Sequence, residues 1–378
     1  MNRALLDYYK CPEEHLDFRI AREHTKDPGY FMFGPNTVCF GSLSSGETSK
    51  SVQGPLHDAT EDMKIVDKAC YLPFDPTSII DNLRLERYVD GFHTNLAAKG
   101  IIRDLYYVLR PMMPVGIRKH LQKRHFKGWE SIRFPRWPLD RTVEQIFQGL
   151  LKLSLKARGV TRTPFIWFWP EGFRSCAIVT HDVESAAGLD FCSSLMDIDD
   201  SYNIKSSFQL IPEGGRYSVS SQFLRDMRSR GFETNIHDLT HDGHLFSTHS
   251  QFVERAQRIN RYAKEFGAKG FRSGQLYRNQ EWQENLDFSY DMSVPNVAHL
   301  DPQRGGCCTV MPYFNGKILE LPLTTTQDYQ YIHILGHSTL DLWKQQIDLI
   351  LECHGLASIL VHPDYVIQMD EQNLYKQL

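Results

Sequence analysis

The chain has 378 residues, 41% hydrophobic and 23% charged, which is typical of a globular protein with enough apolar residues for a sizeable core. The formal net charge of −4 lacks the basic surplus of nucleic-acid binders, so we expect no nucleic-acid partner. No apolar run approaches the roughly 20 residues that a membrane-spanning helix needs. The N-terminus shows no apolar signal core, which predicts a cytoplasmic protein.

Residues 1–170 are irregular in pattern and predict an α+β extension whose role the sequence does not specify. The segment 30–42 places Gly-Pro-Asn between two apolar runs, as in a hairpin. A helix is expected after Asp75, because Pro76 suits a first helical turn. An amphipathic helix is expected from about 142 to 156.

The segment 100–127 mixes apolar and basic residues and allows two interpretations. Its residues of interest are Ile101, Leu105, Tyr106, Tyr107, Leu109, Arg110, Arg118, Lys119, Lys123, Arg124 and Lys127. A solvated basic face is the favoured interpretation. Peripheral contact with an anionic membrane surface is the alternative.

From about Pro170 onward, strand-like and helix-like segments alternate. Strands are expected at 175–180, 206–211, 232–237, 270–273 and 357–361, and helices at 221–230, 250–266 and 338–355. Repeated β–α units predict an α/β fold with parallel strands, whose ligand sites lie at the carboxyl ends of the strands. We therefore expect one catalytic unit over residues 171–378.

Chemistry-bearing residues follow several of these strands. Asp182 and Glu184 stand two apart, so both can face one pocket of an extended chain while Val183 faces away, although an isolated strand-end acid more often caps a helix. His237 and His241 stand four apart, which on a helical turn brings both imidazoles within reach of one ion. Two histidines and one carboxylate form a usual metal-ligand set, and His244 and His249 are expected to be bystanders.

Two further strand ends complete the pattern. Arg272 follows one strand with a guanidinium that stays charged. His362, in Leu-Val-His-Pro, stands at the end of the last strand, where a histidine can act as a general acid near neutral pH.

This order of motifs resembles the polysaccharide deacetylases of carbohydrate esterase family four, the NodB type, over about residues 171–378. The resemblance implies an incomplete (β/α) barrel, with Asp182 as base, Arg272 orienting it and His362 as acid. It also implies a divalent ion, expected to be Zn²⁺, on Glu184, His237 and His241.

The chain departs from the family in its first motif, which reads Thr-His-Asp-Val-Glu: Val183 occupies the usual ligand position, and the ligand acid is expected one residue later, although Asp182 stays open as the ligand. The family's histidine is usually tuned by an aspartate. Asp291 is weakly favoured for this role over Asp328.

The activity implied by the resemblance is removal of the N-acetyl group from an amino sugar or glycan precursor. Two alternatives stay open: hydrolysis of another amide by the same fold, as in deformylases and cyclic-amide hydrolases, and a non-catalytic carbohydrate-binding protein that has lost its metal. The sequence does not identify the sugar, its carrier or the oligomeric state.

Overall fold

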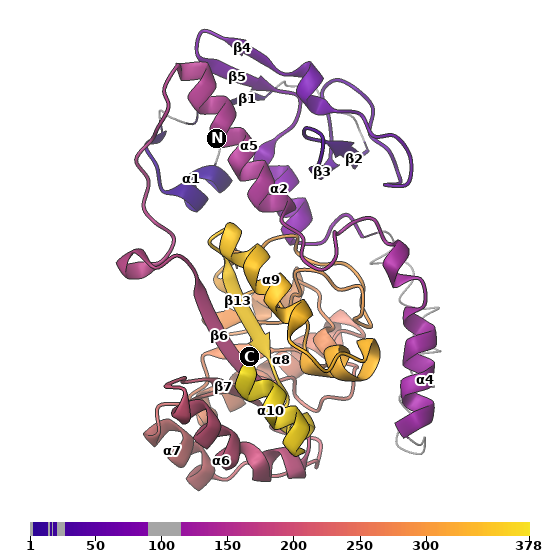
Figure 1. Cartoon of the computed structure of the whole chain (residues 1–378), viewed down its shortest axis with the longest axis vertical. Helices are drawn as coiled ribbons and strands as arrows, with labels where there is room; N and C mark the ends of the chain where they lie inside the picture. The colour runs from indigo at the N-terminus through magenta and orange to yellow at the C-terminus, as the bar shows by residue number, and fades with distance from the viewer. Residues whose placement is uncertain (1–2, 14–15, 17, 21–26, 90–114) are drawn as a thin grey trace.

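The computed structural model describes residues 3–13, 16, 18–20, 27–89 and 115–378 (Figure 1). Residues 100–114, part of the segment considered for membrane contact, lie outside the described residues. Among the described residues, no helix is both long enough and apolar enough to cross a bilayer.

The first part of the chain forms two small sheets and four labelled helices. The elements are α1 (Arg3–Tyr9), β1 (Phe18–Ile20), β2 (Gly29–Met32), β3 (Val38–Gly41), β4 (Lys64–Val66), β5 (Ala69–Leu72), α2 (Pro76–Arg84), α4 (Val115–Phe126) and α5 (Thr142–Arg158). β2 and β3 pair antiparallel, which confirms the hairpin, and β1–β5–β4 form a separate sheet. α2 begins at Pro76 with the Asp75 carboxylate accepting from the backbone of Thr77, so that predicted start is also confirmed. α5 confirms the helix expected from about 142.

The second part forms an eight-stranded sheet flanked by helices. Its strands are β6 (Cys176–Val183), β7 (Ser207–Leu210), β8 (Glu233–His237), β9 (Gly270–Arg272), β10 (Tyr290–Asp291), β11 (Tyr313–Asn315), β12 (Ile318–Glu320) and β13 (Leu356–Leu360). Its helices are α6 (Ala186–Ser201), α7 (Ser221–Ser229), α8 (His249–Phe266), α9 (Asp341–Glu352) and α10 (Met369–Gln377).

The strand order is β11-β12-β10-β9-β8-β7-β6-β13, and neighbours are parallel except in the β11–β12 hairpin. The chain's first barrel strand, β6, therefore lies beside its last, β13, as the centre of Figure 1 shows. This is the expected incomplete (β/α) barrel.

The gap in the barrel is bridged by side chains. Thr324 accepts from the backbone N–H of Ser358 at 2.9 Å, and its hydroxyl donates to the carbonyl of Leu356 at 2.7 Å. Thr325 donates its hydroxyl to the carbonyl of Ser358 at 2.8 Å. The segment after β12 thus reaches β13 without forming a regular strand there.

Alternation along the strands separates an apolar outer face from a polar interior. Val183, Phe208, Ile236 and Phe271 are buried in one apolar cluster with residues of the flanking helices, such as Leu195, Leu224 and Phe252. The alternate positions, Asp182, Gln209, His237 and Arg272, are buried and polar. Because a polar interior needs partners, its side chains form the network described below.

The N-terminal elements pack on the barrel through buried polar contacts. Glu86, just past α2, forms a buried ion pair with Arg278, and its carboxylate also accepts from the backbone of Gly306 at 2.6 Å. Asn296 donates to the carbonyl of Asp140 and accepts from its N–H, both at 2.8 Å. All labelled strands of the eight-stranded sheet follow residue 170, whereas a separately folding unit beginning at 171 stays a prediction.

Candidate active site

Three of the predicted ligands converge at the carboxyl ends of β6 and β8. One donor atom from each of Glu184, His237 and His241 lies within 4.8 Å of the others. His237 is the last residue of β8, and Glu184 directly follows β6. The carboxylate of Glu184 lies 3.1 Å from Nε2 of His241. Asp182 is not part of this group of three, although its Oδ2 lies 3.7 Å from Nε2 of His237.

The local chemistry of His237 fits a bound cation. Its Nδ1 lies 3.1 Å from the carbonyl oxygen of Arg272, so Nδ1 carries the proton and Nε2 presents a lone pair. Nε2 is buried, without a hydrogen-bond partner among the described residues. Burial lowers the pKa of His237 to about 4, which keeps the ring neutral near pH 7, as a metal ligand requires. Together with the carboxylate of Glu184 and the imidazole of His241, this free lone pair makes a two-histidine, one-carboxylate ligand set of the kind that Zn²⁺ prefers.

The two histidines are not brought together by a helical turn, and that expectation is wrong. Asp238 and His241 have φ values of 58° and 54°, in the left-handed region, so the chain doubles back in an irregular loop after β8. The imidazole rings lie 4.8 Å apart. His244 and His249 are not members of the group of three.

Asp182 lies deeper in the barrel, against Arg272 at the end of β9. NH1 of Arg272 donates to Oδ1 of Asp182 and to the hydroxyl of Thr180, both at 2.9 Å. Burial alone would raise the pKa of Asp182, but the charges of Arg272 and His362 outweigh it and hold this pKa below its usual value. Asp182 is therefore ionised near neutral pH, with Oδ2 directed to the histidine side.

His362 approaches the group from the other side, just past β13. Its Nε2 lies 3.9 Å from the carboxylate of Glu184. Its Nδ1 lies 2.6 Å from Oδ1 of Asp328, whose Oδ2 also accepts from the His362 backbone at 2.8 Å. Burial alone would lower the pKa of His362. The nearby carboxylates of Asp328, Glu184 and Asp182 have a larger, opposite effect and raise this pKa to about 10. The ring is therefore held as an imidazolium.

The weak preference for Asp291 as the partner of His362 is corrected by this contact. Asp291 ends β10 and is fully buried, with Gln283, Ser293 and the backbone of Met292 as its partners. Burial raises the pKa of Asp291 to about 6. The neighbouring carboxyl group of Glu320, on β12, forms a hydrogen bond with Asp291, and burial raises its pKa as well. Asp291 thus belongs to a buried acid pair with Glu320. Its strand, β10, is separated from β13 by four strands of the sheet.

Two contacts of the site were not anticipated from sequence. Thr180, on β6, is a second acceptor for Arg272, and its place two residues before Asp182 was the only signal. Gln275, three residues after Arg272, lies within 2.9 Å of His241. No sequence pattern marks Gln275, because its position depends on an irregular turn.

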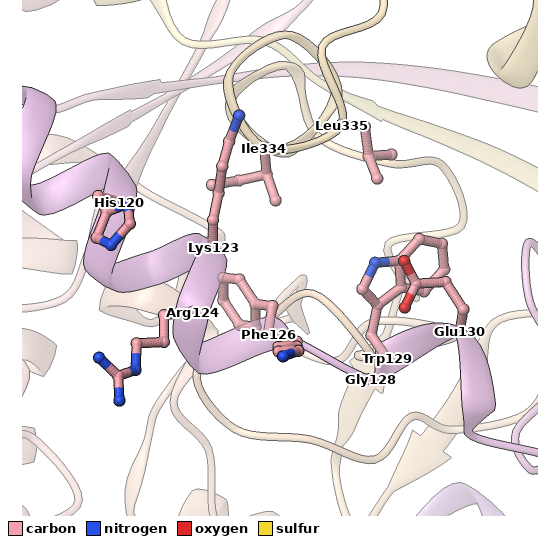
Figure 2. A pocket seen from close by; sticks show the side chains of 10 residues that line it. His120, Lys123, Arg124, Phe126, Gly128, Trp129, Glu130, Ile334 and Leu335 are labelled. Atoms are coloured by element: carbon pink, nitrogen blue, oxygen red, sulfur yellow. The ribbon is translucent and has the colours of Figure 1, made fainter.

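A separate hollow of about 460 Å³ lies between α4 and the π-helical turn η8 (Tyr329–Leu335) (Figure 2). Phe126, Trp129, Ile334 and Leu335 border it, and Lys123 rises on one side. None of the predicted catalytic or metal residues lines this hollow. The membrane-surface interpretation of the segment 100–127 stays a prediction.

Comparisons with known proteins bear on the fold. No family model matches the chain, and no curated protein matches it. Among solved structures, a polysaccharide deacetylase from Mycobacterium smegmatis is 15% identical, with a TM-score of 0.43 over 55% of this chain and 84% of that one.

Two further solved structures are similar to the chain at comparably low sequence identity and TM-score. A polysaccharide deacetylase involved in O-antigen biosynthesis from Bordetella bronchiseptica is 18% identical, with a TM-score of 0.35 over 52% of this chain and 75% of that one. A peptidoglycan deacetylase mutant from Bacillus subtilis is 12% identical, with a TM-score of 0.32 over 54% and 80%. At such values the chemistry must be inferred from the site itself.

Proposed function

We propose that this chain is a metal-dependent hydrolase that removes the N-acetyl group from an amino sugar or glycan precursor in the cytoplasm. The observation that carries the proposal is the convergence of three groups at one end of the barrel. These are a two-histidine, one-carboxylate set, an arginine-bound aspartate, and a histidine paired with a second aspartate. Metal-assisted amide hydrolysis uses a Lewis acid, a base and an acid. The first group would hold the ion that acts as Lewis acid, the aspartate would be the base and the histidine the acid.

Glu184, His237 and His241 are the residues that would hold the ion, with Zn²⁺ expected from the donor set. When bound there, such an ion polarises a substrate carbonyl and makes water more acidic. Glu184 is favoured over Asp182 as the ligand, because Oδ1 of Asp182 is already bound to Arg272. This assignment also leaves Oδ2 of Asp182 available for a proton.

Asp182 is the proposed general base. Its low pKa keeps it ionised, and the single hydrogen bond from NH1 of Arg272 fixes the direction of its carboxylate. It accepts a proton from the water that attacks the acetyl carbonyl. Arg272 keeps its charge throughout and acts by orienting the base.

His362 is the proposed general acid. The amine leaving group of an amide must be protonated as the C–N bond breaks, and the imidazolium of His362 donates that proton from Nε2. Asp328 holds Nδ1, so that Nε2 is the nitrogen left to face the site.

The choice of an acetylated amino sugar rests on the motif resemblance described above, and its test is product release. We expect acetate to be released from at least one member of a panel of N-acetyl sugars, offered free and on nucleotide or lipid carriers. Release of formate, or opening of a cyclic amide without acetate, would support the alternative amide substrates instead.

Metal content distinguishes a metal-dependent enzyme from the alternative of a non-catalytic carbohydrate-binding protein that has lost its metal. The full chain, purified without chelator, is expected to carry about one divalent ion, and His237→Ala to lose it, because this change removes one of three ligands. Elemental analysis of both proteins measures this. A wild-type chain that takes up no ion even when Zn²⁺ is supplied would favour the non-catalytic alternative.

A further inference from the structure

The turn that follows Arg272 is strained where it meets the proposed metal site. Gln275 and Leu276 have φ values of 54° and 55°, a region that non-glycine residues rarely adopt. A Cβ on Gly274 would stand 2.5 Å from Oδ2 of Asp238 and 3.0 Å from Cδ2 of His241, so this turn and the loop after β8 are in close contact. Backbone strain of this kind persists only where surrounding contacts enforce it.

The strained turn places the side chain of Gln275 against His241, one of the three proposed metal ligands. The amide Nε2 of Gln275 lies 2.9 Å from Nδ1 and 3.2 Å from Nε2 of His241. The amide Oε1 of Gln275 is buried and has no partner among the described residues. A rotation of the amide by 180° exchanges these two atoms and gives Oε1 the contact with the ring.

His237 shows what a ligand histidine requires of its second nitrogen. Its Nδ1 lies 3.1 Å from the backbone carbonyl of Arg272, which leaves Nε2 for an ion. His241 is buried, and its Nε2 faces Glu184 at 3.1 Å. Its Nδ1 therefore needs an acceptor whenever Nε2 holds an ion.

We propose that Gln275 is the positioning residue for His241: its amide oxygen accepts the Nδ1 proton of His241 and fixes the ring with Nε2 toward the ion. This inference rests on the proposed function, because it assumes that His241 is a metal ligand. A glutamine suits the position, because its amide can donate to an unprotonated Nδ1 in the metal-free chain and accept from a protonated one in the loaded chain.

The test compares Co²⁺ binding by the full-length wild type and two variants after removal of metal by a chelator. Gln275→Ala removes the acceptor, so the Co²⁺ dissociation constant is expected to rise about 10–100-fold, with an altered d–d absorption spectrum. Gln275→Glu keeps an acceptor oxygen at the same reach and is expected to restore both. Gln280→Ala is the matched control, because Gln280 is buried five residues further along and contacts Arg84 and Tyr313.

Wild-type affinity and an unchanged spectrum in Gln275→Ala would overturn the proposal. So would equal weakening in Gln280→Ala, since that indicates a general loss of structure, which the melting temperatures of the metal-free proteins also report. If the wild type binds no Co²⁺, the proposed metal-dependent function is refuted, and the contact between Gln275 and His241 must be tested separately. The ¹⁵N shift of His241 Nδ1 in the metal-free chain then decides the contact: it must change in Gln275→Ala, and an unchanged shift refutes the role of Gln275.

Discussion

Two buried arginine–carboxylate pairs in this molecule differ in how completely they are satisfied. Arg278 donates from Nε and NH2 to the two carboxylate oxygens of Glu86, and from NH1 to the carbonyl of Leu276. Arg272 donates from NH1 to a single oxygen of Asp182, and its NH2 is buried without a partner among the described residues. Both guanidinium side chains are 0% exposed, so burial does not distinguish them.

The difference fits a structural role for the Glu86 pair and the proposed catalytic role for the Asp182 pair. In the Glu86 pair the carboxylate is also bound by the N–H of Gly306, and it joins the N-terminal elements to the barrel. In the Asp182 pair the second oxygen lies 3.7 Å from Nε2 of His237 and remains available. A bidentate contact fixes both carboxylate oxygens, whereas a contact to one oxygen leaves the other free to accept a proton, as the proposed general base requires.

The largest expected effect comes from breaking the Asp182 pair. Asp182→Asn keeps the size of the side chain but cannot accept a proton, so kcat for amide hydrolysis should fall about 10²–10⁴-fold. Metal content should stay close to wild type, because Asp182 is not among the proposed ligands, whereas the melting temperature should fall because the buried Arg272 charge loses its partner; kcat is therefore compared per folded molecule. Full activity in this variant with metal bound would refute the assigned roles of Asp182 and Glu184.

The Glu86 pair should lose stability without losing kcat. Glu86→Gln leaves the Arg278 charge buried and uncompensated, and breaking a buried pair on one side costs about 3–5 kcal/mol. We expect the free energy of unfolding in urea to fall by this order, with kcat per folded molecule near the wild-type value. A variant that unfolds normally but loses kcat would place the Glu86 pair in the catalytic machinery and end the distinction.

A smaller effect tests the correction at His362. The Asp328 carboxylate raises the pKa of His362, and activity that needs the imidazolium is present below this pKa and lost as pH rises through it. Asp328→Asn should therefore move the basic limb of the pH–rate profile to lower pH, by about 1–3 pH units. Asp291→Asn is the matched control and should leave that limb in place. A shift in Asp291→Asn alone would restore the original preference.

The sequence predicted those parts of the site that belong to regular elements. Asp182, His237 and Arg272 stand at the last or next-to-last positions of β6, β8 and β9, where strand alternation decides which side chains face inward. Asp328 could not be chosen over Asp291, because it precedes a π-helical turn in an irregular segment without periodic pattern.

The same distinction holds for the fold. The strands β6, β7, β8, β9 and β13 and the helices α7, α8 and α9 were expected from their patterns. The helix α10 was not, nor were β10, β11 and β12, which have only two or three residues each and leave no recognisable pattern. The helix α6 was also missed, although Cys192, Leu195 and Met196 are buried at helical spacing and carried the signal. The contacts that attach the N-terminal elements join residues far apart in sequence, such as Glu86 and Arg278, and no local pattern reveals them.

The pairing of β6 with β13 has a consequence for synthesis of the chain. Thr180 of β6 lies beside Leu360 of β13, so one edge of β6 has no strand partner until residues 356–360 have been made. A nascent or truncated chain that ends before Leu356 would expose the β6 edge, and unpaired edges template aggregation. Such a chain would also lack His362. Residues 356–362 therefore both cover the open edge of the first barrel strand and bring His362 to the candidate site.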